Sequence, residues 1–531
     1  MTRRIFVSLL VLLALLAGVS ARSRSRGAMA PRAPKAEARV ESGLLAGAMA
    51  DGVRVFKGIP YAAPPVGELR WRPPQPVAAW QGVREAVEFG ADCPQAPYPQ
   101  LSLYYSPPRA QSEDCLYLNI WTAAKENEKR PVMVWIHGGA LTRGSGAAAT
   151  YDGTRFAKKG VVLVTINYRL GPFGYLAHPA LTAESPQHSS GNYGVLDQIA
   201  ALQWVRKNIA SFGGDPSRVT IFGESAGSWS VNALVASPLA QGLFHRAIGQ
   251  SGAWFGPGVA LKTSRGDQPS AEKIGAAFAK ALGAESLQAL RAVPAGKIVD
   301  VSNVHPEGRR FRTVVNVDGW VLPDEIRNIF AKGRQNDVPV IVGSNANEMT
   351  SLTVPSTIPK TVGEYRNRIE SQYGELVREL DVVYPVRTDA DVPAAYLASM
   401  RDATFTWPMR TWARQTATGR SKAYLYWFSH APPVPNSQFF GAFHAGEIPY
   451  VFHNFNARMN VRDVDARLAE TMMGYWINFA ATGDPNGGGL PKWTPYDLKS
   501  APYMDFGPTV QQKNHLLREQ LDFIEQFQKR R

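Results

Sequence analysis

The sequence predicts an α/β fold built around a large, mostly parallel sheet. Short runs of apolar, β-branched residues alternate along the chain with longer segments of helical periodicity, which is typical of such a sheet. The run over 160–169 is apolar almost throughout, as expected for a strand that is buried on both faces. Another such run ends in a Gly-rich turn, at 219–230, that leads directly into a predicted helix. Functional residues gather at the carboxyl ends of the strands in sheets of this kind.

The predicted strands and helices follow one another in chain order. Apolar runs predict a short strand at the start of 52–71 and further strands at 116–122, 130–139, 160–169, 219–222 and 338–348. The segment 191–216 predicts a helix, because apolar residues recur there at helical spacing, namely at Val195, Ile199, Leu202 and Val205. A Gly-Gly pair near the end of this segment stops the helix, and a second helix is predicted from Ala226 onward.

The N-terminus has the pattern of a secretory leader. Arg3 and Arg4 precede an apolar stretch over 5–19 that ends in Val-Ser-Ala, which predicts a signal peptide over 1–21 with cleavage after Ala21. The stretch is shorter than the roughly 20 residues of a membrane span. An uncleaved anchor is the alternative. We therefore expect a protein exported to the periplasm or the extracellular medium, without stable membrane insertion.

A basic linker is predicted between this leader and the folded part of the chain. Residues 22–38 lack periodic apolar positions and are rich in Arg, so we expect a flexible linker there and one domain over 39–531. The formal net charge of the chain is +14, and about half of this excess lies in the first forty residues. The remainder is spread over the domain without a stripe of basic and aromatic residues. This distribution argues against nucleic acid as a partner.

The chain of 531 residues contains only two cysteines, Cys93 and Cys115. Export would allow them to form a disulfide, and a Cys pair in an exported chain favours the bridge. Two reduced, buried thiols are the alternative.

The turn after the strand at 219–222 carries a candidate nucleophile. Gly223, Ser225 and Gly227 fit the pattern G-x-S-x-G, in which a Ser sits in a strained corner between a strand and a helix. Neighbouring side chains would crowd that corner, so Gly on both sides lets the Ser oxygen stand clear of the sheet. A chance match is the alternative, because the chain contains 47 Gly.

A nucleophilic Ser needs a base and a carboxylate that orients the base. Glu348 ends the strand predicted at 338–348, where a lone carboxylate would be costly without a partner. Among the later histidines, His444 is flanked by Gly and small residues that would let its ring reach a pocket. We expect His430 and His453 to be ordinary packed or surface residues, and His515 to be solvated in a charged C-terminal helix. A surface turn is the alternative interpretation of Glu348.

Two Gly-containing segments could supply the N–H groups that stabilise an oxyanion. The turn at 135–140 follows a predicted strand, and without Cβ atoms its backbone can approach a substrate oxygen closely. The N–H of Ala226, in the first turn of the predicted helix, is the expected additional donor. A plain loop is the alternative for the turn at 135–140.

Several longer motifs resemble those of the type-B carboxylesterases, the family of bacterial para-nitrobenzyl esterases, animal carboxylesterases and cholinesterases. The resemblance runs from about residue 40 to about residue 500. It rests on FGGDPSRVTIFGESAG (212–227), EDCLYLNIW (113–121), FKGIPYAAPPVGELRW, NYRLGPFGYL (167–176), GNYGVLDQIAALQWVRKNI, GQSG (249–252) and WINFAATGDPN (476–486).

The resemblance implies an α/β-hydrolase fold whose long insertions form an active-site gorge. It implies that Ser225 is the nucleophile, Glu348 the acid and His444 the base. It further implies an oxyanion hole formed by Gly139, Ala140 and Ala226, and a Cys93–Cys115 bridge whose loop lies over the gorge. No metal and no organic cofactor is expected, and the protein is expected to be a monomer or a small homo-oligomer.

The chain departs from the family pattern at three places. Ala140 stands where many members have a third Gly, and Met349 stands where a Gly usually follows the acid. The loop over 94–114 contains Tyr98, Tyr104 and Tyr105 but no Trp, whereas cholinesterases carry a Trp there that binds a quaternary ammonium group. Choline esters are therefore not the expected substrates.

These observations predict a serine carboxylic ester hydrolase that acts on small-molecule esters through an acyl-enzyme. One alternative is a non-catalytic binding or adhesion protein on the same fold, and a second is a lipase that acts at membrane surfaces. All three triad residues are present, and no clear amphipathic lid is found, which favours the esterase. Trp254, Phe255 and Trp407 are candidates for the substrate pockets, or else plain core residues.

Overall fold

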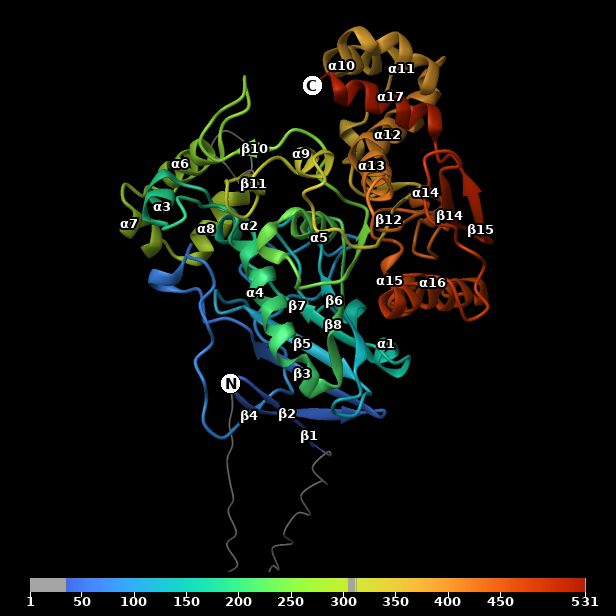
Figure 1. The fold of residues 1–531 in the computed structure, drawn as a ribbon. Coiled ribbons are helices and arrows are strands. Elements are labelled where there is room, and N and C mark those ends of the chain that lie inside the picture. The colour runs from blue at the N-terminus through green and yellow to red at the C-terminus, as the bar shows by residue number, and fades with distance from the viewer. Residues whose placement is uncertain (1–34, 304–310, 312, 531) are drawn as a thin grey trace, which may run out of the picture. The chain divides into compact units, whose positions relative to one another are not determined.

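A sheet of thirteen strands forms the centre of the computed structural model, which describes residues 35–303, 311 and 313–530 (Figure 1). The strand order is β1-β2-β3-β5-β7-β6-β8-β9-β12-β13-β14-β15, with β4 beside β2. Neighbouring strands are parallel from β7 to β14, whereas the outer strands pair antiparallel except for β4, which runs parallel to β2. The predicted α/β fold with a mostly parallel centre is confirmed.

The strands are β1 (Lys35–Val40), β2 (Gly43–Ala50), β3 (Val53–Pro60), β4 (Val83–Glu85), β5 (Tyr117–Thr122), β6 (Arg130–Ile136), β7 (Val162–Ile166), β8 (Gly214–Glu224), β9 (Arg246–Gln250), β12 (Val340–Asn345), β13 (Ala423–Phe428), β14 (Pro502–Phe506) and β15 (Val510–Asn514), and β10 (Val259–Ala260) pairs with β11 (Asn316–Val317) apart from the main sheet.

The helices are α1 (Thr154–Lys158), α2 (Gly171–Tyr175), α3 (Pro179–Glu184), α4 (Tyr193–Asn208), α5 (Ala226–Ala236), α6 (Ala271–Ala281), α7 (Leu287–Ala292), α8 (Ala295–Asn303), α9 (Ile326–Ala331), α10 (Val362–Tyr373), α11 (Val377–Val383), α12 (Val392–Arg401), α13 (Trp407–Ala417), α14 (Ser437–Phe440), α15 (Ile448–Val451), α16 (Asp463–Thr482) and α17 (Arg518–Lys529).

The strand β6 shows how the sheet separates two apolar layers. Val132 and Val134 pack in one hydrophobic cluster together with residues of α4 and α5, whereas Met133 and Trp135 pack in another with residues of α1 and α16. Successive side chains of a strand point to opposite faces, so an all-apolar strand is buried on both sides. Every residue of β6 after Arg130 is buried.

The predicted elements match the structure closely in the middle of the chain. The predicted helix over 191–216 corresponds to α4 and a short 3-10 turn, which end at Gly213 with a φ of 81°. That left-handed conformation favours Gly and stops the helix, as the Gly-Gly pair predicted. The predicted strands correspond to β3, β5, β6, β7, β8 and β12. The strand β12 ends at Asn345, so Glu348 does not end the strand but begins a short 3-10 turn after it.

Two predictions near the ends of the chain need correction. The predicted linker over 22–38 extends too far, because β1 begins at Lys35 and pairs antiparallel with β2. His515 does not lie in the C-terminal helix, since it is an exposed turn residue with a φ of 59° and α17 begins at Arg518. The predicted signal peptide and the rest of the linker lie outside the described residues.

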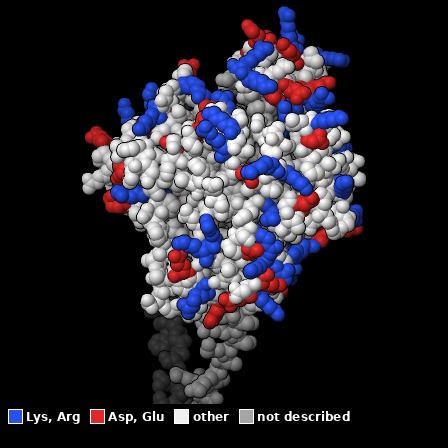
Figure 2. Space-filling view, viewed as in Figure 1, with Lys and Arg blue, Asp and Glu red and all other residues white. Residues whose placement is uncertain are grey.

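Cys93 and Cys115 form a disulfide with a Cα–Cα distance of 5.0 Å. Among the described residues, no helix is both long and apolar enough to cross a membrane. Figure 2 shows Lys and Arg interspersed with Asp and Glu over the visible face.

Candidate active site

Ser225 occupies a strained corner between β8 and α5. Its φ of 55° and ψ of −120° are rare for a residue with a side chain, and such outliers concentrate at functional sites. The backbone N–H of Ser225 donates to the carbonyl of Gln250 at the end of β9, at 2.8 Å. Ser225 is partly exposed, although both of its neighbours are buried. The hydroxyl is thus held at the surface of an otherwise closed corner.

The two glycines that flank Ser225 leave no space for a side chain. A Cβ on Gly227 would lie 2.0 Å from the carbonyl oxygen of Ile136, and one on Gly223 would lie 2.6 Å from the same atom. Ile136 ends the neighbouring strand β6, which is paired with β8 at Gly223. The pattern G-x-S-x-G is therefore required by the close approach of two strands at this corner.

His444 is buried and paired with Glu348. Its Nδ1 lies 2.6 Å from Oε2 of Glu348, so Nδ1 carries the proton and donates it to the carboxylate. The other oxygen of Glu348 accepts the backbone N–H of Asn345 at 2.7 Å. The ring of Phe405 packs against that of His444 with centroids 4.8 Å apart. These contacts fix the orientation of the imidazole and leave Nε2 facing away from Glu348.

The Nε2 atom of His444 lies 3.2 Å from Oε1 of Glu224, the residue that precedes Ser225. The structure thereby brings His444 and Glu348 to the corner that carries Ser225, from positions more than a hundred residues later in the chain. The sequence interpretation missed Glu224. The signal was a carboxylate at the end of a strand that is otherwise apolar, next to the candidate nucleophile.

A third buried carboxylate, Glu447, shares Asn345 as a hydrogen-bond donor with Glu348. It accepts hydrogen bonds from Asn345 at 2.6 Å and from Gln250 at 3.0 Å, and all three side chains are fully buried. Glu447 follows His444 by three residues, and the sequence interpretation did not single it out. The network ties the carboxyl ends of β9 and β12 to the segment that carries His444.

The surrounding carboxyl groups change the pKa values in this site. Burial alone would lower the pKa of His444, but the carboxylates of Glu224, Glu348 and Glu447 outweigh it and raise the pKa above its usual value. Burial is also the main reason why the pKa of Glu224 is raised well above its usual range, and the nearby Glu447 and Glu348 add to it. Strongly shifted pKa values of this kind are typical of catalytic sites.

The turn after β6 packs directly against Ser225. A Cβ on Gly138 would lie 3.2 Å from the Cβ of Ser225. Gly139 has a φ of 105° and Ala140 a φ of 55°, both in the left-handed region. Ala140 is exposed, and Ala226 opens α5, where the first N–H groups of a helix have no partner within the helix. Ala226 thus follows the candidate nucleophile directly, and Gly139 and Ala140 continue the turn from Gly138, which contacts it.

The disulfide loop over 94–114 contacts the site. The hydroxyl of Tyr104 donates to the backbone carbonyl of His444 at 3.2 Å and shares a hydrogen bond of 2.6 Å with Ser351. The hydroxyl of Tyr98 lies 3.2 Å from the position of a Cβ on Gly139. The loop therefore contacts both the segment that carries His444 and the turn that contains Gly139.

The other candidate residues lie partly beside the site and partly elsewhere in the protein. Met349, the departure from the family pattern after Glu348, is buried. Trp254 packs on Trp229 in the first turn of α5, with ring centroids 4.6 Å apart, whereas Phe255 packs on Phe330 in the main core. His430 belongs to a separate buried pair, with its Nε2 2.6 Å from Oδ1 of Asp465.

The comparison with protein families decides the classification. The model of the carboxylesterase family matches residues 34–524. The chain belongs to the carboxylesterase family. Carboxylic ester hydrolysis is the activity that this family membership supports.

Individual carboxylesterases are similar over most of their length. The fumonisin B1 esterase of Sphingopyxis macrogoltabida is 39% identical, over 90% of this chain and 87% of that protein. The para-nitrobenzyl esterase of Bacillus subtilis (strain 168) is 36% identical, over 84% of this chain and 89% of that protein. A solved structure of a PNB esterase, which is 32% identical, superposes with a TM-score of 0.78 over 92% of this chain and 99% of its own. These likenesses confirm the predicted family and fold.

Proposed function

We propose that this carboxylesterase hydrolyses small-molecule esters with a Ser225–His444–Glu348 triad through an acyl-enzyme. The observation that carries the proposal is the orientation of His444. Glu348 holds its Nδ1–H, so its Nε2 lacks a proton when the ring is neutral and faces the corner that carries Ser225. This is the tautomer that a general base requires.

The first half of the reaction forms the acyl-enzyme. Nε2 of His444 takes the hydroxyl proton of Ser225 as the oxygen attacks the ester carbonyl, which gives a tetrahedral oxyanion. Glu348 remains ionised and stabilises the imidazolium. The imidazolium then donates its proton to the leaving alcohol oxygen as the C–O bond breaks, and the acyl group stays on Ser225.

The second half repeats these steps with water. His444 takes a proton from a water molecule, the hydroxide attacks the acyl carbon, and the proton returns to Ser225 as the carboxylic acid leaves. In both halves the backbone N–H groups of Gly139, Ala140 and Ala226 would stabilise the oxyanion, because donors fixed in advance need no reorganisation.

A panel of p-nitrophenyl esters with acyl chains of increasing length tests this proposal. The enzyme should hydrolyse the shorter members, and Ser225→Ala should abolish turnover while its thermal unfolding stays close to that of the wild type. Ser217→Ala, at an exposed Ser, is the matched control and should keep full activity. A folded wild-type protein that hydrolyses no ester would instead favour the non-catalytic binding role.

We also propose export with cleavage after Ala21. The disulfide between Cys93 and Cys115 supports this proposal, since such bonds persist in oxidising compartments. Intact mass spectrometry of protein recovered from the periplasm or medium should give a chain that begins at Arg22. A chain that still begins at Met1 would contradict cleavage.

A further inference from the structure

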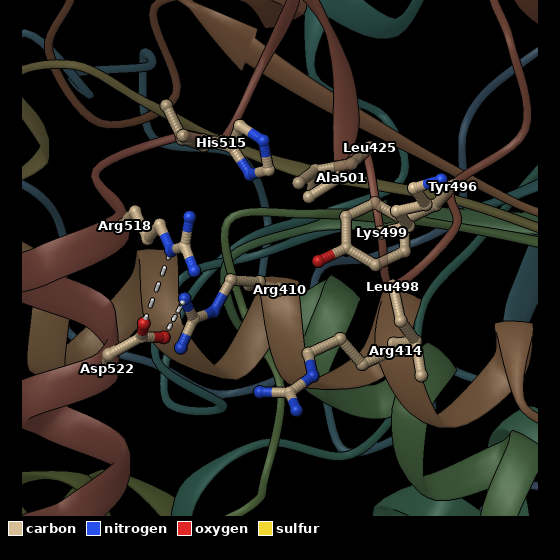
Figure 3. Close-up of a pocket in the computed structure, with 11 residues that line it drawn as sticks. Arg410, Arg414, Leu425, Tyr496, Leu498, Lys499, Ala501, His515, Arg518 and Asp522 are labelled. Atoms are coloured by element: carbon tan, nitrogen blue, oxygen red, sulfur yellow. Dashed lines mark hydrogen bonds and ion pairs between the residues drawn. The ribbon is translucent and has the colours of Figure 1, made fainter.

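We propose that a cavity between α13, β13 and α17 binds a small organic anion that has an apolar part, such as a monocarboxylate. None of its lining residues belongs to the triad, the oxyanion turn or the 94–114 loop. Its lining, shown in Figure 3, includes the cationic side chains of Arg410, Arg414, Lys499 and Arg518 and the apolar side chains of Leu425 and Leu498.

The size of the cavity limits the ligand. Its volume is about 200 Å³. Pockets for drug-sized molecules measure about 300–1,000 Å³, so the cavity takes a smaller molecule and excludes a folded partner. Its lining residues lie on α13, β13 and α17 and in the segments that precede β14 and α17.

The lining is positively charged. Four cationic side chains face the cavity, and Asp522 is the single carboxylate among the lining residues. Two further carboxylates lie nearby: Glu525 pairs with Arg414, and Asp497 accepts the backbone N–H of Lys499 at 2.8 Å. The cations still outnumber the carboxylates. A charge excess in a concave site raises the local concentration of ligands of the opposite sign.

Arg410 is the part of the lining that points most directly to a ligand. Its side chain is 8% exposed, and its Nη1 donates to Asp522 at 2.8 Å. Its Nη2 lies 3.4 Å from Glu525. Its Nε is buried and has no hydrogen-bond partner among the described residues. Arg410 lines the cavity, so an anionic oxygen there could gain a charge-assisted hydrogen bond from its guanidinium.

Arg518 can turn toward a ligand at little cost. It lies 3.9 Å from Asp522 on the same helix, and both side chains are more than half exposed. Exposed ion pairs of this kind contribute little to stability, because water and salt screen them. Figure 3 shows Arg410 and Arg518 reaching Asp522 from two sides. A carboxylate that enters the cavity would meet both guanidinium groups.

The other wall of the cavity is apolar. It is formed by the side chains of Leu425, Leu498, Ala501 and Leu516 and by the ring of Tyr496. Leu498 is 58% exposed, so its side chain is accessible to a ligand in the cavity. A bare inorganic anion would leave this wall unused. A short alkyl or aryl carboxylate would contact both the cationic and the apolar wall. For this reason we propose an organic monocarboxylate as the class of ligand.

Calorimetric titration with octanoate tests the proposal. Lys499→Met combined with Arg518→Met removes two exposed cations, and the double variant should weaken one binding event by tenfold or more. Arg410→Met should do the same, and the double variant keeps the test valid if Arg410→Met fails to fold. Arg420→Met is the control, because Arg420 is exposed and pairs with Asp337 outside the cavity. It should leave octanoate binding unchanged.

Two further ligands and one location experiment complete the test. Octan-1-ol and inorganic phosphate should each bind at least tenfold more weakly than octanoate. Octan-1-ol lacks the negative charge, and phosphate lacks the alkyl chain. In crystals soaked with 6-bromohexanoate, anomalous density should place bromine beside Leu425 and Leu498. Octanoate binding that all variants retain, phosphate binding as tight as octanoate binding, or bromine at the triad alone would overturn the proposal.

Discussion

The Nδ1 atom of His444 lies 2.6 Å from Oε2 of Glu348, and both side chains are buried. A second buried pair has the opposite arrangement, since His430 contacts Asp465 through Nε2. Of these two histidines, only His444 keeps its Nε2 free of its main carboxylate partner, and only its ring lies beside Glu224, the residue that precedes Ser225. The two pairs are chemically alike, so they provide a matched comparison for the role of the base.

Replacing these two histidines separately should give opposite results. His444→Ala should lower kcat by several orders of magnitude, because no other group takes the proton of Ser225. His430→Ala should lower the melting temperature, since it leaves the buried Asp465 with one partner fewer, but kcat should stay within a few fold. Steady-state kinetics and calorimetry on both variants measure this. If His444→Ala were active and His430→Ala were folded but inactive, the base would be His430 and not His444.

The dependence of activity on pH should report the raised pKa of His444. Its protonated form cannot accept a proton, so kcat/KM should rise with pH through a limb that lies above the usual His value of about 6.5. Glu348→Gln removes one of the carboxylates that raise this pKa. The limb should then move to lower pH, and kcat should fall by roughly 10⁴-fold as the ring loses its orientation. A limb below pH 6 in the wild type would contradict the arrangement of carboxylates.

The corner at Ser225 should not tolerate a methyl group on its flanking glycine. Gly227→Ala would place a Cβ 2.0 Å from the carbonyl oxygen of Ile136, so β6 and β8 would have to separate. We expect a clear drop in melting temperature together with a loss of activity. Gly296→Ala is the control, because a Cβ there meets open space within α8, and it should be neutral or stabilising by up to about 1 kcal/mol. Equal melting temperatures for both variants would contradict this account of the corner.

The disulfide should stabilise the loop that covers the site. The bridge closes a loop with a sequence separation of 22, which corresponds to about 3 kcal/mol in the chain-entropy model. Cys115→Ser should therefore lower the melting temperature. It should also loosen substrate selectivity more than it slows hydrolysis of a small ester, because Tyr104 loses its fixed place beside His444. Thiol titration and the ester panel measure both effects. Unchanged stability together with two free thiols in the wild type would contradict the bridge.

The sequence predicted much of the centre of the sheet, but the central strands β9 and β13 and the edge strand β1 were missed. Buried parallel strands are apolar on both faces, so β6, β7 and β12 stood out clearly. The strand β1 was missed because its buried positions include Ala36 and Ala38, whose small side chains give a weak hydrophobic alternation. The turn at His515 was missed because periodicity does not fix the start of a helix at its boundary residues.

The candidate site was predictable where one short motif carries the chemistry. Ser225 and its glycines are consecutive, and the oxyanion turn follows directly after a strand. The sequence showed that Glu224 lies next to the nucleophile, but it could not show the contact of Glu224 with His444 or the place of Glu447, since packing around His444 brings together segments far apart in the chain. The cavity beside α17 has no local signal for the same reason.

Covalent labelling of the nucleophile tests the central claim most directly. The enzyme is incubated with a fluorophosphonate until activity is lost, and the modified peptide is identified by tandem mass spectrometry. The account predicts one adduct per chain, on Ser225, with loss of activity in proportion to labelling and no labelling of Ser225→Ala. An adduct on another residue, or an enzyme that stays active after Ser225 is fully labelled, would contradict it.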